Sequence, residues 1–198
     1  MLPKLFKPIY FNNKKLIRVG SLDDGGYVIP KITFQNTEKL ISYGISDNWE
    51  FEREFTNRAS CGVEAYDFSL TNEYWLMQFK KDLIKFLQLK IFKPKKIYKI
   101  FQYLDFIYFF SVKKKNKFKL KKIGSGKKDM SLSKTINTEK QDLFFKIDIE
   151  GFEYQILNEI IKFKKNMVCL VIEFHDVSKN KKKILNFILK SKKVLSLV

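Results

Sequence analysis

The chain has 198 residues, which suits a single domain over residues 1–198 and leaves little room for two. Hydrophobic residues make up 45% of the chain and charged residues 30%, which excludes a disordered polar chain. No stretch approaches the roughly 20 apolar residues that cross a bilayer, and no secretory signal pattern opens the chain, so we expect a cytoplasmic protein.

The formal net charge of +18 comes almost entirely from lysine. Of the 39 basic residues only Arg18, Arg53 and Arg58 are arginine, the side chain best suited to bidentate contacts with phosphates. Residue types encoded by A/T-rich codons are abundant throughout, which indicates a genomic base bias that raises the lysine content. We therefore interpret the charge as a solvated lysine surface and do not expect nucleic acid as the main partner.

Residues 1–35 are predicted to form an N-terminal hairpin segment, because two short apolar runs flank the glycine-rich stretch 20–26. From residue 39 onward, single apolar strands alternate with helices. We expect strands at 40–45, 61–66, 143–148 and 167–172, and helices at 48–57 and 151–161. The continuous apolar run 167–172 is typical of a strand buried on both faces of a sheet. This alternation predicts an α/β fold with a mostly parallel, doubly wound sheet, whose ligands bind outside the carboxyl ends of the strands.

Aromatic and lysine residues are concentrated in the segment 71–115, which we expect to form a helical insertion broken into two pieces at Lys93–Lys96. Two interpretations remain open for this segment. It is either a crossover helix with an insertion packed on the sheet, or a substrate lid or helix pair that makes peripheral contact with an anionic membrane.

Candidate cofactor-binding residues follow the first two strands of the sheet. Gly44 permits a sharp turn, and Ser46 and Asp47 lead into a helix N-terminus whose free N–H groups can bind polar cofactor groups. Asp67, about 20 residues further on, ends the next strand, where a carboxylate can accept hydrogen bonds from the ribose hydroxyls of an adenosine cofactor. Phe68 is expected to contact the same cofactor.

Candidate catalytic residues follow the next two strands. Asp148 and Glu150 lie two apart at a strand end, and such like charges are costly together unless they meet a cation, a donor or a proton. Glu173 and the chain's single histidine, His175, come after the following strand. We therefore expect catalysis from Asp148, His175 and Glu150, and a divalent-cation site at Asp148 and Glu173.

These patterns resemble the FkbM-type family of S-adenosylmethionine-dependent methyltransferases. The resemblance rests chiefly on Lys146-Ile-Asp-Ile-Glu-Gly-Phe-Glu153, which is similar to the family signature K-(I/V)-D-(I/V)-E-G-x-E. Further similarities lie in Ala65–Asp67, in Val171–His175 and in the opening segment Arg18–Val28. The resemblance implies a Rossmann-like class I methyltransferase fold, S-adenosylmethionine as cofactor, and O-methylation of a sugar or another small-molecule hydroxyl.

The chain departs from the family pattern at two places. The family's D-x-G-x-x-x-G motif is replaced by Ser42–Asn48. The sequence also stops inside a strand beginning near residue 194, so we expect the C-terminal antiparallel hairpin to be missing or incomplete, with a strand edge open to pairing in a homo-oligomer. Two alternatives follow: a truncated, non-catalytic remnant or partner-binding module, and a nucleic-acid-binding protein or nucleic-acid methyltransferase.

Overall fold

The computed structural model describes residues 13–87, 98–136 and 142–191. The predicted helix break at Lys93–Lys96 and the predicted strand from residue 194 lie outside these residues. Within the described ranges, no helix has the length and hydropathy needed to span a bilayer.

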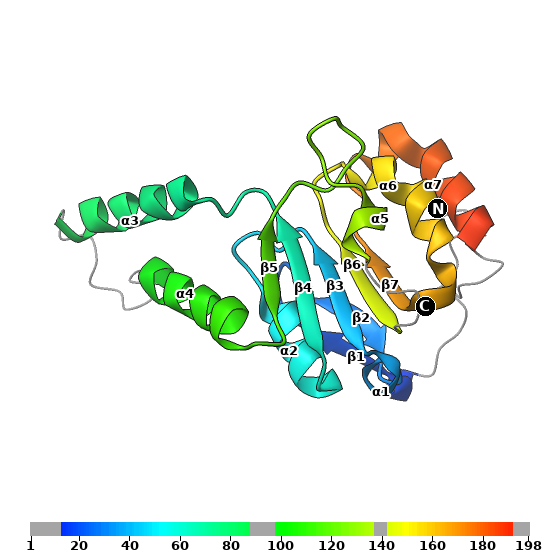
Figure 1. Ribbon diagram of the computed structural model, residues 1–198, viewed down its shortest axis with the longest axis horizontal. Helices are drawn as coiled ribbons and strands as arrows, with labels where there is room; N and C mark the ends of the chain where they lie inside the picture. Colours follow the sequence, from blue (N-terminus) through cyan, green and yellow to red (C-terminus); the bar gives the residue numbers. More distant parts are fainter. Residues whose placement is uncertain (1–12, 88–97, 137–141, 192–198) are drawn as a thin grey trace.

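Five parallel strands form the central sheet, in the order β5-β4-β3-β6-β7 (Figure 1). Their bounds are β3 Lys39–Tyr43, β4 Gly62–Asp67, β5 Lys117–Leu120, β6 Leu143–Ile147 and β7 Met167–Ile172. The chain winds outward from β3 through β4 to β5, then returns to pair β6 with the other side of β3. This reversal makes the carboxyl ends of β3 and β6 the switch point of a Rossmann-like α/β fold, which confirms the predicted fold class.

Helices cover both faces of the sheet, because side chains along each strand alternate between the two faces. On β3, Leu40 packs with α2 (Glu50–Ala59), whereas the next residue, Ile41, packs with α6 (Glu153–Lys162) and α7 (Val177–Ser191). On β6, Phe144 lies on the same face of the sheet as Leu40, and Phe145 lies on the same face as Ile41. The helices are α1 Thr33–Asn36, α2 Glu50–Ala59, α3 Asn72–Leu87, α4 Tyr98–Ile107, α5 Leu132–Thr135, α6 Glu153–Lys162 and α7 Val177–Ser191.

The strands and helices predicted from the alternation of residue types agree with the observed bounds to within two residues. The predicted burial of 167–172 on both faces is wrong for the described part of the chain. In the described ranges, all six residues of β7 are half-buried, because β7 lies there at an edge of the sheet and pairs with β6 alone.

The N-terminal segment contains an antiparallel hairpin of β1 Leu16–Val19 and β2 Tyr27–Pro30, which packs against α2. The aromatic and basic segment contains α3, α4 and a π-helical turn, η4 Tyr108–Val112. In Figure 1, α3 and α4 lie beyond the β5 edge of the sheet, on the side away from α6 and α7. Trp75 and Phe106 anchor these helices, since Phe106 packs on Phe118 of β5 with ring centroids 4.9 Å apart.

Candidate functional site

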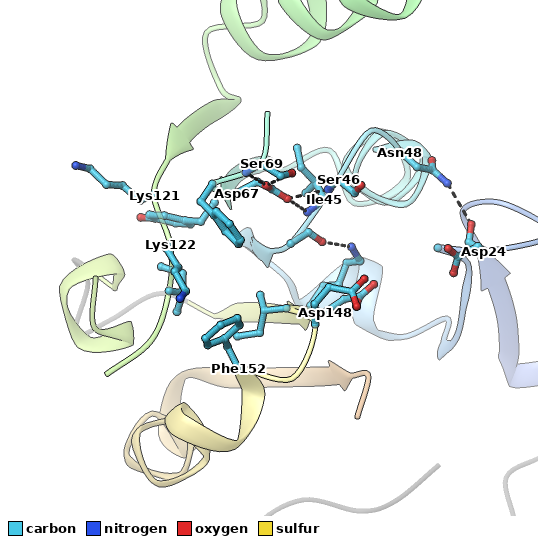
Figure 2. Close-up of a pocket in the computed structure, with 18 residues that line it drawn as sticks. Asp24, Ile45, Ser46, Asn48, Asp67, Ser69, Lys121, Lys122, Asp148 and Phe152 are labelled. Carbon is cyan, nitrogen blue, oxygen red and sulfur yellow. Dashed lines mark hydrogen bonds between the residues drawn. The ribbon is translucent and has the colours of Figure 1, made fainter. Parts of the chain in front are cut away.

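A cavity of about 240 Å³ opens at the carboxyl ends of β3, β4 and β6, at the switch point of the sheet (Figure 2). Its lining combines turn residues after each of these strands with residues that follow β5. Among the residues expected to bind a cofactor or to catalyse, Gly44, Ser46, Asp67, Phe68, Asp148 and Glu150 line it.

The turn after β3 is held tightly against the end of β6. Gly44 has a φ of +74°, and a Cβ atom there would overlap the backbone carbonyl oxygen of Asp148. The Lys146 ammonium, which is 3% exposed, donates to the Gly44 carbonyl oxygen at 2.9 Å and lies 3.3 Å from the buried carboxylate of Glu52. The glycine is therefore required by close packing between two strand ends, and Lys146 fixes the position of the turn.

Backbone strain collects at the same edge of the sheet. Ser46, Glu150 and Asp176 all adopt positive φ angles, between 46° and 51°, and they follow β3, β6 and β7 respectively. Non-glycine residues adopt this conformation only where the surrounding structure enforces it, and such positions gather at ligand-binding sites.

Asp67 ties the turn after β3 to the end of β4. Its Oδ2 accepts hydrogen bonds from the backbone N–H groups of Ile45 and Ser46 at 3.0 and 2.8 Å. Its Oδ1 accepts from both the backbone N–H and the hydroxyl of Ser69, each at 2.6 Å (Figure 2). The residue expected to bind a ribose therefore lies in the cavity wall, but the chain itself supplies four donors to its carboxylate.

The structure does not bring Asp47, an expected cofactor-binding residue, into this cavity. Its carboxylate accepts hydrogen bonds from Tyr74 of α3, at 2.9 Å, and from Lys99 of α4. Burial opposes ionisation of Asp47, but these donors outweigh it and lower its pKa. Asn48 takes the place beside the cavity, where its amide donates to the Asp24 carbonyl oxygen at 3.1 Å.

An aromatic wall closes the side of the cavity next to β5. Phe68 and Phe152 both line it, and the Lys122 ammonium lies 5.8 Å from the first ring centroid and 3.7 Å from the second. Ring faces attract a cation electrostatically, so Lys122 rests on a surface that also suits a flat, electron-poor ring.

At the edge of the cavity, Asp148 meets residues from two other parts of the chain, the hairpin and the turn after β7. The Tyr27 hydroxyl donates to Asp148 Oδ2 at 3.1 Å and to Glu173 Oε2 at 3.0 Å. Burial and both carboxylates raise the pKa of Tyr27, so the phenol keeps its proton and bridges the two acids. The hairpin therefore contributes directly to the carboxylate cluster.

His175 completes this cluster from the turn after β7. Its Nε2 lies 3.4 Å from Glu150 Oε2 and 3.8 Å from Asp148 Oδ1, and its Nδ1 lies 3.4 Å from Glu153 Oε1. Burial lowers the pKa of His175, but the three surrounding carboxylates outweigh burial and raise it above its usual value. The imidazole is thus more readily protonated than a free histidine.

The donor set of this cluster also suits a divalent cation. One ligand atom each from Asp148, Glu173 and His175 lies within 4.8 Å of the others, in partly buried positions. Carboxylate oxygens with one imidazole nitrogen are ligands that Mg²⁺ or Mn²⁺ accepts. The expected catalytic residues therefore converge with the expected metal ligands Asp148 and Glu173.

Three further residues of the site escaped the sequence reasoning: Tyr27, Lys146 and Glu153. Glu153 is fully buried and accepts from the Gly151 and His175 backbone N–H groups at 2.8 and 2.7 Å, which joins the turns after β6 and β7. Lys146 and Glu153 lie within the motif that carries the family resemblance, so the motif itself held the signal. Tyr27 follows the Gly25–Gly26 pair, and no local pattern connects it to Asp148.

A second cavity, of about 620 Å³, lies between α2 and α4 and shares Asn48 with the first cavity. Most of the residues that line it are polar. The Asp105 carboxylate accepts from the Trp49 indole N–H at 3.0 Å and from Arg53. Such hydrogen-bonding groups suit a hydroxyl-rich molecule.

A parallel α/β sheet with a cavity at its switch point and a carboxylate cluster beside it defines an enzyme domain of the Rossmann-like class. The family profile of the methyltransferase FkbM domain matches residues 92–193, slightly more than half of the chain. The chain therefore belongs to the FkbM methyltransferase domain family, as the Lys146–Glu153 motif predicted, and it is a methyltransferase. Searches of the curated proteins and of the solved structures found no significant match.

Proposed function

We propose that this methyltransferase binds S-adenosylmethionine in the cavity beside Gly44, Asp67 and Phe68 and methylates a hydroxyl oxygen of a sugar or similar small molecule. The observation that carries the proposal is the convergence of Asp148, Glu173 and His175 beside that cavity. A hydroxyl is a poor nucleophile until its proton leaves, and carboxylates and imidazoles are groups that take such a proton.

The residues that line the cavity suit the parts of this cofactor. The apolar surfaces of Phe68, Ile123 and Phe152 suit a flat purine, and the carboxylate of Asp67 suits ribose hydroxyls. S-adenosylmethionine supplies a methyl group that is already activated. The chain therefore has to align the acceptor, exclude water and take up one proton.

We assign the uptake of that proton to Asp148. The surrounding carboxylates favour the protonated form of His175, which has no free lone pair to accept a second proton. Protonated His175 then balances the charge of Asp148, Glu150 contacts the same imidazole, and Tyr27 holds Asp148 and Glu173 in register through its shared hydroxyl.

The proposal extends to a divalent cation bound at the carboxylate cluster. Asp148, Glu173 and the neutral form of His175 would hold it, the cation replacing the proton that His175 otherwise carries, and its chemistry there would be to lower the pKa of a hydroxyl bound beside it. Tyr27 would then give up its two hydrogen bonds to the carboxylates.

The polar second cavity supports a hydroxyl-rich acceptor. It shares Asn48 with the cofactor cavity, so a molecule bound there lies next to the proposed site of methyl transfer. Arg53, Asp105 and Gln102 offer both donors and acceptors along its wall, as recognition of several hydroxyl groups requires.

Calorimetric titration with S-adenosylmethionine tests the first half of the proposal, and formation of S-adenosylhomocysteine with a panel of monosaccharides tests the second. Asp148→Asn should keep cofactor binding within a few-fold and lower transfer by about 100-fold or more, because it removes the proton acceptor. Asp23→Asn, at an exposed carboxylate in the hairpin turn, is the matched control and should leave both measurements unchanged.

Each failure of this experiment has a separate meaning. No heat of binding with the wild-type chain would refute the proposed cofactor and favour a non-catalytic, partner-binding module. Full turnover by Asp148→Asn would refute its assigned role. Cofactor binding with no methylation of any monosaccharide would overturn the sugar acceptor. Loss of transfer in a chelator, restored by Mg²⁺ or Mn²⁺, would support the cation, and full transfer in the chelator would exclude it.

A further inference from the structure

The helices α3 and α4 carry apolar side chains that no other described part of the chain covers. Of the eighteen large hydrophobic side chains that are exposed in the described residues, eleven lie between residues 72 and 112. Such a concentration is unusual for a surface that meets only water, and it marks a surface of interaction. They are Leu76, Met77, Leu83, Ile84, Leu87, Ile100, Phe101, Leu104, Ile107, Tyr108 and Val112.

These side chains form one stripe on each helix. On α3 they recur from Leu76 at i, i+1, i+7, i+8 and i+11, and from Ile100 of α4 they recur at i, i+1, i+4, i+7 and i+8. At 3.6 residues per turn each set covers a single face. The packing face of each helix is different, since Trp75 meets Tyr103 at 5.0 Å and Phe106 at 5.7 Å between ring centroids. The exposed stripes are therefore not needed to hold the helices on the sheet.

Lysine accompanies these stripes. The sequence from 71 to 115 contains eleven lysines and three acidic residues. Two of the acids already face cations, because Asp105 pairs with Arg53, and Asp82 lies 3.9 Å from Lys85. Lys80 and Lys81 are exposed and make no ion pair with the described residues, and Lys80 lies one helical turn beyond Leu76 on the same stripe.

We propose that α3 and α4 dock this chain on an anionic lipid surface, with the apolar stripes in the interface and the lysines against the headgroups. Amphipathic helices with aromatic and aliphatic residues on one face and lysines beside it bind such surfaces. In the part of the chain that the structure describes, α3 has 16 residues and α4 has 10, which is too short to span a bilayer. The contact is therefore parallel to the surface.

Two further observations favour a lipid surface over a second copy of the chain. Two copies joined through this face would bring together two lysine-rich segments from chains that each carry a net charge of +18. The helices also project beyond the β5 edge of the sheet, so a flat surface can reach them without meeting α6 or α7 (Figure 1).

Vesicle sedimentation tests the proposal with two lipid compositions, phosphatidylcholine alone and phosphatidylcholine with about 30% phosphatidylserine. We expect the full chain to bind the anionic vesicles, to bind the neutral ones weakly, and to lose affinity as salt is raised from about 0.05 to about 0.5 M. Replacing Lys80 and Lys81 by Gln should weaken binding by about fivefold per lysine, which corresponds to about 1 kcal/mol each. The matched control is Lys181→Gln with Lys182→Gln, two exposed lysines of α7.

The apolar part of the contact has its own variant. Leu83→Asn with Leu104→Asn removes one side chain from each stripe, both 57% exposed, and should weaken binding about tenfold or more. Leu22→Asn with Leu189→Asn changes two exposed leucines away from the stripes and should have no effect. Circular dichroism of each variant would show that the fold is retained, as expected for exposed positions.

Three results would overturn the proposal. The first is no binding to anionic vesicles. The second is equal binding to both vesicle types that neither stripe nor lysine variants weaken. The third is a concentration-dependent dimer in sedimentation equilibrium that Leu83→Asn with Leu104→Asn dissociates, which would assign the face to self-association. None of these measurements depends on methyl transfer, so the proposal stands or falls apart from the proposed enzyme activity.

Discussion

Asp67 lies where an adenosine ribose is expected, yet its two carboxylate oxygens already accept four hydrogen bonds from the chain. For a ribose hydroxyl to reach this carboxylate, one of the four donors has to leave. Three of them are backbone N–H groups fixed by the turns, whereas the Ser69 hydroxyl can rotate away. Three of the hydrogen bonds to Asp67 are therefore structural, and the fourth, from the Ser69 hydroxyl, can be exchanged for a ligand.

Two variants separate these parts. Ser69→Ala removes the competing hydroxyl, so binding of S-adenosylmethionine should stay unchanged or tighten by up to about fivefold. Asp67→Asn should weaken binding about tenfold or more, because a neutral amide is a poorer acceptor than a carboxylate. Calorimetry gives both affinities. If Ser69→Ala weakened binding as much as Asp67→Asn, Ser69 rather than Asp67 would hold the ribose.

Single residues could be predicted from the sequence where a strand end alone fixes their position. Gly44, Asp67 and Asp148 were expected at the carboxyl edge on that ground, and they lie there. Tyr27 could not be found in this way, because its hydrogen bonds to Asp148 and Glu173 join residues more than a hundred positions apart. Asp47 turned toward Lys99 of α4, whose packing no local pattern specified.

At the scale of elements, the turns after β3 and β6 hold the site, and each contains a glycine with a positive φ angle. Their surroundings differ. A Cβ at Gly44 would overlap the Asp148 carbonyl oxygen, whereas at Gly151 nothing lies within 4 Å of such an atom. The positive φ angle disfavours an L-residue at both positions. Only at Gly44 would the side chain also collide with the end of a neighbouring strand.

Replacing each glycine by alanine measures that difference. Gly151→Ala should lower the free energy of unfolding by about 1 to 2 kcal/mol, the cost of a left-handed backbone. Gly44→Ala should cost about 3 kcal/mol or more, since β3 and β6 must also separate. Urea unfolding of both variants gives the comparison. Equal destabilisation would mean that the turn moves freely and that close packing does not require Gly44.

Elements were predicted well where the period of apolar residues is clear, as in β6 and α6. The position of each strand within the sheet was harder to predict from the sequence. The continuous run of β7 has the composition of a central strand, but in the described chain it is an edge strand with half-buried residues. Composition reports how apolar a strand is, whereas its burial depends on which elements pack beside it.

At the scale of the whole molecule, a net charge of +18 places the few buried carboxylates among many lysines. Glu64 on β4 is the clearest case, because its side chain is only 7% exposed. Lys39 of β3 donates to it at 2.7 Å, and Lys119 of β5 pairs with its other oxygen. One carboxylate therefore joins three neighbouring strands across the sheet.

This arrangement predicts how the stability of the fold depends on pH. Burial opposes ionisation of Glu64, but hydrogen bonds from Lys119, Lys39 and Tyr66 outweigh it and lower its pKa from 4.5 to about 2. Because the folded-state pKa is the lower one, the stabilisation is fully present above about pH 4.5 and is lost as the pH falls toward 2. The shift corresponds to at most about 3 kcal/mol.

Urea unfolding between pH 7 and pH 2.5 measures this contribution by comparing the wild-type chain with Glu64→Gln. The variant should be less stable at pH 7 and should lose less stability on acidification, so the two curves approach each other below about pH 4.5. Glu38→Gln, at an exposed carboxylate beside β3, should follow the wild-type curve closely. Parallel curves for the wild type and Glu64→Gln would show that other carboxylates control the acid response, and that the link across β3, β4 and β5 adds little to the stability of the sheet.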